Sequence, residues 1–183
     1  MSNVLFLQVA EVAAPSVKFD GVYKHDGDAP FLSFNTLSFY VDGIKSSAMY
    51  TVLDRAVLQE QTFLRQTWMR KDVLQYMADR SALINLSKSR LCLSPTLEAN
   101  IGARTKVLII DEIFMQEPVR EVQHFQSVLA KFRQEYGAEY LIVCLDWAYL
   151  IESVQDRVIP HPSVFAAQSG YTHTGLLWYA NDN

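Results

Sequence analysis

Several features that mark specialised protein classes are scarce in this chain of 183 residues. The four histidines lack the paired spacing of metal ligands, so we expect exposed or capping residues and no metal site. Cys92 and Cys144 lie in separate apolar runs without a C-x-x-C motif, which indicates buried, reduced thiols and a reducing compartment. No serine or cysteine lies in a nucleophile-elbow motif, so a hydrolase triad has no support.

Charge and hydropathy argue against two further classes of partner. The 16 Lys and Arg against 20 Asp and Glu give a net charge of −4, without the basic surplus that sequence-independent nucleic-acid binding needs. Apolar runs stay well short of the roughly 20 residues of a membrane helix. The strand-like run Val4 to Val9 lacks the basic leader of a signal peptide. We therefore expect a cytoplasmic protein that binds neither nucleic acid nor membrane.

The chain is rich in apolar residues, which make up 50% of it and suffice for one substantial core. The stretch from Thr105 to Trp147 is typical of a strand, a helix and a second strand. Branched residues from Val107 onward predict a buried strand that runs to Met115. Pro118 predicts the first turn of the helix, because the N–H that proline lacks has no partner there. One apolar face then recurs at helical spacing: Val119, Val122, Phe125, Val128, Leu129, Phe132 and Tyr136.

Gly137 ends this predicted helix, where we expect it to take positive φ. The apolar run Leu141 to Leu145 predicts a strand parallel to the first one, because a helical crossover separates them. The other expected elements are a strand over 4–9, a loop over 18–30, a hairpin turning at Asp42-Gly43, a strand over 46–53, a helix from its cap Asp54 to about Asp79, short strands over 82–86 and 90–93, a loop over 94–102, a short helix over 162–168 and a strand over 171–179.

From Lys106 to Tyr179 the order of elements resembles the carboxyl-terminal half of the GNAT (N-acetyltransferase) superfamily. The resemblance is carried by VLIIDEIFMQEPVREVQHFQSVLAKFRQEYGAEYLIVCL and by PSVFAAQSGYTHTGLLWYA. It implies an α/β fold whose mixed, mostly antiparallel sheet has a central splayed parallel strand pair flanked by helices. The strand over 46–53 and the two short strands then become the first, second and third strands of that sheet. Residues 1–45 are expected to be an extension packed on a GNAT-like domain of residues 46–183.

The resemblance implies an acetyl-coenzyme A site at the loop between the strand and the helix. The residues at matching positions are Met115, Gln116, Val119, Arg120, Glu121 and Val122. That family cradles the pyrophosphate with backbone N–H groups of a Q/R-x-x-G-x-G/A loop, whose small residues let the phosphates approach. The matching segment QEPVREVQHF has no glycine, and Glu117 and Glu121 add negative charge. Arg120 is the residue in it that favours a phosphate.

The catalytic residues of the family are also only partly matched. Its frequent general acid is a tyrosine on the last short helix, and Ala166 stands at that position. Asp111 and Glu112 lie on the strand where some members carry a base carboxylate. Either residue would need a pKa raised toward neutrality by burial to deprotonate an amine. The alternative is a structural carboxylate at a strand edge or in an internal salt bridge.

The sequence therefore leaves two functions open. One is an acetyl-coenzyme A dependent N-acetyltransferase acting on an unidentified amine, with Glu112 or Asp111 as base. The other is a non-catalytic interaction or assembly protein that pairs with a protein partner or with itself through strands of the segment 1–45. The missing glycines and the missing tyrosine favour the second function.

Overall fold

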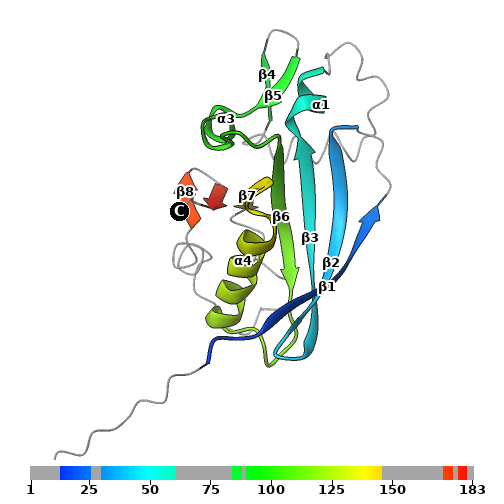
Figure 1. Ribbon diagram of the computed structural model, residues 1–183, viewed down its shortest axis with the longest axis vertical. Helices are drawn as coiled ribbons and strands as arrows, with labels where there is room; N and C mark the ends of the chain where they lie inside the picture. Colours follow the sequence, from blue (N-terminus) through cyan, green and yellow to red (C-terminus); the bar gives the residue numbers. More distant parts are fainter. Residues whose placement is uncertain are drawn as a thin grey trace, which may run out of the picture.

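The computed structural model describes residues 13–25, 30–60, 84–87, 90–145, 171–174 and 177–180. A seven-stranded sheet has the strand order β1-β2-β3-β6-β7-β9-β8, and β4 and β5 form a separate hairpin (Figure 1). This confirms a mixed α/β fold with a mostly antiparallel sheet. The elements are β1 (Val17–His25), β2 (Leu32–Val41), β3 (Ile44–Asp54), α1 (Arg55–Glu60), β4 (Ile84–Ser87), β5 (Arg90–Leu93), α3 (Pro95–Asn100), β6 (Lys106–Phe114), α4 (Val122–Tyr136), β7 (Tyr140–Leu145), β8 (Tyr171–Thr174) and β9 (Leu177–Ala180).

The parallel pair predicted at the centre of the sheet is confirmed. β6 and β7 run parallel, with Val107 opposite Leu141 and Ile110 opposite Cys144. Continuous apolar runs suit these strands because both faces of each are covered: every residue from Val107 to Ile110 is buried. Cys144 is a buried thiol as predicted, whereas Cys92 is a partly exposed one.

The predicted hairpin and its turn are also confirmed. β2 and β3 pair without interruption from Leu32–Leu53 to Val41–Ile44. Asp42 and Gly43 have φ of 49° and 82°, the left-handed values that a two-residue turn between such strands needs. At the other end of β3, the Asp54 Oδ1 atom accepts the N–H groups of residues 56 and 57 at 3.0 and 3.1 Å, so it caps α1 as predicted.

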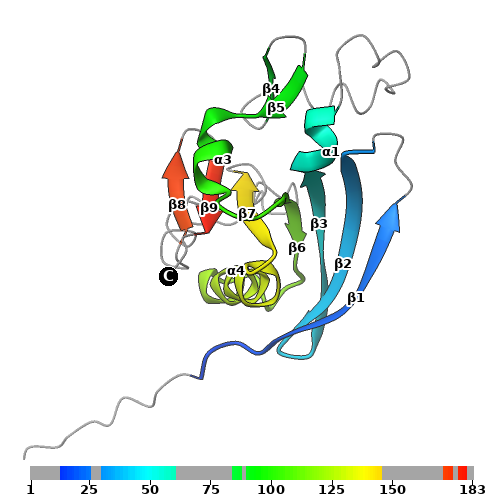
Figure 2. The same cartoon turned by 45° about the horizontal axis from the view of Figure 1, so that its top comes forward.

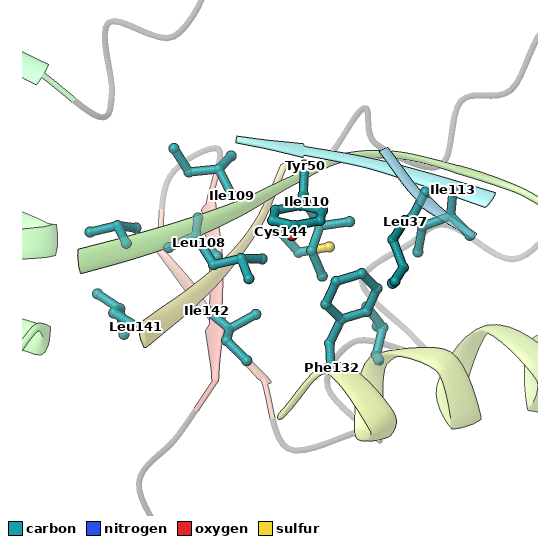
Figure 3. Close-up of a cluster of buried hydrophobic side chains, with 14 of the residues drawn as sticks. Leu37, Tyr50, Leu108, Ile109, Ile110, Ile113, Phe132, Leu141, Ile142 and Cys144 are labelled. Atoms are coloured by element: carbon teal, nitrogen blue, oxygen red, sulfur yellow. The ribbon is translucent and has the colours of Figure 1, made fainter. Parts of the chain in front are cut away.

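α4 covers one face of the sheet, and its apolar side closes the core (Figure 2). Phe132 is fully buried, and its ring lies 5.1 Å from that of Phe19 and 6.2 Å from that of Tyr50. Figure 3 shows Tyr50 and Ile110 pointing from the sheet toward this ring. Burial raises the pKa of Tyr50 above its ordinary value, and it does the same for Tyr136, so both phenols are held in the neutral form.

Two segments predicted as loops are regular structure. Within 18–30, residues up to His25 belong to β1, because Phe19 packs on Phe39 and Phe132 while a register shift between Phe19 and Gly21 takes up one extra residue. Within 94–102, α3 forms because the Ser94 hydroxyl accepts the N–H of Leu97 at 3.4 Å and proline occupies the first turn.

The predicted helix over 118–136 was placed too early. α4 begins at Val122, and Pro118 lies in a preceding turn after a cis peptide bond. The N–H groups of His124 and Phe125 reach the carbonyl of Glu121, so the helical bonding starts there. Gly137 does end the helix, but with φ of −62°. A Cβ at this position would lie 2.5 Å from the Arg133 carbonyl oxygen, which is what requires glycine.

The assignment of strands to the main sheet was wrong for the two short ones. β4 and β5 pair only with each other among the described strands, beyond the end of the main sheet and next to α1 (Figure 1). The expected extension supplies β1 and β2 instead, and residue 45 lies inside β3. β3 is covered by its hairpin partner on one edge and by β6 on the other, so it has no edge left for a short strand. The strand over 4–9, most of the helix over 54–79 and the helix over 162–168 lie outside the described residues.

Candidate functional site

The loop predicted to hold a cofactor folds back on itself. Met115 and Val119 are buried at its two ends, and the Val119 N–H donates to the Gln116 carbonyl at 2.9 Å. The Arg120 Nε atom donates to the Met115 carbonyl, which draws the guanidinium over the loop. Arg120, which the sequence predicted to bind a phosphate, therefore donates a hydrogen bond to the backbone of its own loop.

The start of α4 is capped by a histidine. The Glu121 N–H donates to His124 Nδ1 at 3.2 Å, so the ring proton sits on Nε2, which lies 3.5 Å from Asp42 Oδ2. The other carboxylate oxygen of Asp42 accepts the Ser16 N–H at 2.8 Å. His124 thereby links the helix to the β2–β3 turn and to the start of β1, and the prediction of a capping histidine is confirmed for this residue.

These bonds decide what the loop offers to a ligand. The N–H groups of Val119, Glu121, His124 and Phe125 all donate within the loop and the first turn. Pro118 has no N–H to give. Of the predicted cofactor residues, Met115 and Val119 are buried, Gln116 and Glu121 are exposed, and Arg120 and Val122 are partly exposed. These four N–H groups therefore donate within the protein and are not free for a pyrophosphate.

The two candidate base carboxylates have different surroundings. Met49 lies opposite Glu112 and Tyr50 opposite Ile110, so Asp111 is the extra residue of a β-bulge. Asp111 is buried, and its Oδ2 atom accepts the Thr51 hydroxyl at 2.6 Å. Glu112 is exposed. Asp111 is therefore placed as an internal acceptor, and Glu112 as a surface carboxylate.

A cavity of about 490 Å³ opens beside the loop, in the size range of small-molecule sites. Ser38, Ser47 and Phe114 are direct neighbours on β2, β3 and β6, so the three side chains form a row on one face of the sheet. The cavity continues past the last β3–β6 pair toward the loop. Its lining residues are Thr36, Ser38, Lys45, Ser46, Ser47, Phe114, Met115, Gln116 and Arg120.

Sequence reasoning found only three of these lining residues, Met115, Gln116 and Arg120. The serines and Thr36 were missed because each sits in a strand where a hydroxyl side chain is ordinary. The signal that was available is Ser47, next to Lys45 in space along the strand and opposite Ser38 across the predicted hairpin.

The lining is electropositive and rich in hydroxyl groups. Lys45 and Arg120 carry its charge, and no carboxylate belongs to it. Within the described residues, the hydroxyls of Ser38 and Ser46 are buried and have no hydrogen-bond partner. A buried hydroxyl without a partner costs about 1–3 kcal/mol. The two cations suit an anionic ligand, whereas the Ser38 and Ser46 oxygens are buried and do not face the open space of the cavity.

The described part of the chain was compared with two further kinds of feature, a cluster of metal-ligating side chains and a membrane-spanning helix. No group of three or more His, Cys, Asp and Glu side chains in these ranges could hold a metal ion. None of the helices described is long and apolar enough to cross a membrane. Comparison of the chain with protein-family models, with curated proteins and with solved structures gave no match.

Proposed function

We propose that the protein is a non-catalytic assembly protein whose scaffold resembles that of the GNAT acetyltransferases. The carrying observation is the closed loop before α4, in which Arg120 bonds to the Met115 carbonyl and His124 takes the Glu121 N–H. An acyl-coenzyme A site of that family needs these groups to face the pyrophosphate. The hydrogen bond from Thr51 to buried Asp111 supports the same proposal, because it gives that carboxylate a structural role.

The surface proposed for assembly is the outer edge of β1. β1 ends the strand order of the main sheet, and its residues from Asp20 onward are exposed. Val22 and Tyr23 are 49% and 67% exposed, the highest values among the large hydrophobic residues described. An edge strand of nine residues with unpaired backbone groups can accept another strand.

The proposed partner is a second copy of the chain, because β1 is complementary in charge to itself. In an antiparallel pairing centred on Val22, Asp20 of each copy lies opposite Lys24 of the other, and Gly21 lies opposite Tyr23. Each opposite-charge pair across two strands contributes about 0.2–1 kcal/mol, and like charges at the same place are unfavourable. The symmetry of a twofold dimer makes both pairs at once.

A charge-swap experiment tests this dimer. We expect sedimentation velocity to show concentration-dependent dimers for the wild type and monomers for Asp20→Lys and for Lys24→Asp. An equimolar mixture of these two variants restores mixed dimers in which every cross-strand pair is again opposite in charge. Lys131→Asp on α4 serves as the control and leaves association unchanged. A wild type that stays monomeric at high concentration, or variants that associate as it does, would contradict the proposal.

The alternative function is an acetyl-coenzyme A dependent N-acetyltransferase. The cavity favours it, since Met115, Gln116 and Arg120 of the predicted cofactor loop line that space. Calorimetric titration with acetyl-coenzyme A distinguishes the two functions. We expect no heat of binding and no change in melting temperature, because the N–H groups of Val119, Glu121, His124 and Phe125 already have acceptors and the loop has no glycine. Micromolar binding, about −8 kcal/mol, would favour the enzyme. An acceptor screen with Glu112→Gln as control would follow.

A further inference from the structure

We propose that the face of the main sheet opposite α4 binds an acidic, partly apolar segment of a partner protein, a property that goes beyond assembly through β1. This open face is defined by the exposed side chains of Tyr23, Met49 and Phe114. They are three of the four large hydrophobic residues that are exposed in the described part of the chain, and Met49 and Phe114 are 44% and 39% exposed. Exposed apolar side chains gathered on one surface are typical of binding sites.

The register of the strands brings these side chains together. Met49 follows Tyr50 on β3 in the alternation of the strand, and Tyr50 meets α4 through the ring of Phe132, so Met49 points to the other face of the sheet. Direct partners across β1, β2, β3 and β6 form one row on this face: Tyr23, Thr36, Met49 and Glu112. The adjacent row carries the small side chains Ser38 and Ser47 and ends in Phe114. Four neighbouring strands make the open face roughly 14 Å wide.

The cavity beside the β6–α4 loop forms a socket in the open face. Its volume is about 490 Å³, and Phe114 and Met115 give it an apolar wall. A large apolar side chain of a partner can enter it, as the anchor residues of protein interfaces do. Tyr23 and Met49 lie outside the lining of the cavity. A chain segment that continues across the face therefore covers more of the exposed apolar surface than a small molecule in the cavity does.

Charge complementarity favours an acidic segment. Lys18 on β1 and Lys45 on β3 are exposed and flank Tyr40 as its direct partners. Arg120 lines the cavity and adds positive potential, although its Nε atom is bonded to the Met115 carbonyl. The chain as a whole has a net charge of −4, so this end of the open face differs in sign from the whole molecule. Such a local potential attracts and orients an acidic partner.

Glu112 sets the direction of the bound segment. It is exposed beside Met49, two rows away from Lys45. Like charges that face each other across an interface are unfavourable, so the acidic residues of the segment lie toward Lys45 and away from Glu112. A second copy of the chain paired through β1 does not occupy this surface, because strand addition extends the edge of a sheet and covers neither face.

Fluorescence anisotropy with labelled synthetic peptides tests the proposal. Two probes carry one phenylalanine with a run of glutamates either before it or after it. Control peptides have serine in place of the phenylalanine, or lysines in place of the glutamates. We expect at least one glutamate probe to bind, and its controls to bind at least about tenfold more weakly. Absence of binding by both probes at millimolar concentration would overturn the proposal. Binding to vesicles of phosphatidylserine and phosphatidylcholine, but to neither peptide, would overturn it in favour of a membrane surface.

Substitutions of apolar residues locate the site on the open face. Phe114→Ser is expected to weaken binding of the probe about tenfold, because an apolar wall of the socket is lost. Phe114→Leu keeps that wall and is expected to bind nearly as the wild type does. Val22→Ser removes a similarly exposed apolar side chain from the other face, where Val22 lies opposite buried Leu37, and leaves binding unchanged.

Charge is tested separately. Lys45→Glu is expected to weaken binding several-fold and to make it less sensitive to salt, whereas Glu112→Gln is expected to strengthen it. Lys131→Glu on α4 is the control for charge and leaves binding unchanged. Dissociation constants equal to that of the wild type for both Phe114→Ser and Lys45→Glu would overturn the proposal. These two positions lie on β6 and β3, away from the edge of β1, so both variants still form β1-paired dimers, and failure of the open face is distinguishable from failure of assembly.

Discussion

Replacing Phe132 by alanine is expected to lower the free energy of unfolding by about 3–5 kcal/mol. This ring is fully buried between α4 and the sheet and touches three aromatic rings, those of Phe19, Tyr50 and Tyr136. The variant loses the transfer free energy of the ring and leaves a cavity that rigid strands close only in part. Each aromatic contact adds about 0.5–1.5 kcal/mol beyond area burial. Urea unfolding followed by circular dichroism measures the change.

Two further variants show how much of this loss in the free energy of unfolding comes from the aromatic ring. Phe132→Leu fills most of the volume but removes the ring contacts, so we expect a loss of about 1–2 kcal/mol. Lys131→Ala, at the neighbouring helix position, removes a surface ion pair with Glu135 and a hydrogen bond to Gln134, and it is expected to cost about 0.5 kcal/mol or less. A Phe132→Ala cost as small as that of Lys131→Ala would mean that α4 does not hold the sheet as described.

The parts of the fold that could be predicted from the sequence are those with local causes. Asp42 and Gly43 have the two residue types that tolerate positive φ, and the strands on either side of them pair as nearest neighbours. The parallel pair β6 and β7 was predictable because its continuous apolar runs are joined by an amphipathic helix. In both cases the local sequence pattern that forms the strand also indicates which strand it pairs with.

The parts that could not be predicted depend on distant neighbours. β1 reads as a polar loop, since only Phe19 and Val17 of its residues reach the core, and its partners Phe39 and Phe132 lie far along the chain. The first turn of α4 depends on His124, whose ring accepts one N–H and faces Asp42 across the molecule. Pro118 is a frequent first residue of helices, but here that histidine cap sets the start further on.

The candidate site shows the same limit. Its cavity is lined by residues of β2, β3 and the loop after β6. Patterns in a single sequence do not show which distant segments lie side by side. Arg120 was identified as a phosphate-binding residue for its charge alone. The burial of Ser46, whose hydroxyl has no partner among the described residues, could not be predicted from its residue type.

Thr51→Val is the second substitution for which a large effect is expected, a loss of about 1–3 kcal/mol in the free energy of unfolding. Thr51 is fully buried, and its hydroxyl donates to Asp111 Oδ2 at 2.6 Å. Valine keeps the shape and the β-branch but removes the donor, so a buried carboxyl oxygen loses a hydrogen bond. Thr51→Ser keeps the donor and removes one methyl group, which costs about 1 kcal/mol. A greater loss for serine than for valine would show that packing, not the hydrogen bond, matters at this position.

A double-mutant cycle connects this result to function. If Asp111 is a structural acceptor, Thr51→Val and Asp111→Ala are coupled, and the double variant loses less stability than the sum of the two single variants by about 0.5–3 kcal/mol. Glu112→Gln on the exposed side of the same strand should change stability by no more than about 0.5 kcal/mol. A general base needs an oxygen atom within hydrogen-bonding distance of the attacking amine, and the Thr51 hydroxyl already donates to Asp111 Oδ2. Strong coupling therefore assigns Asp111 to the bulge and leaves the exposed Glu112 as the carboxylate that an acetyltransferase mechanism would have to use.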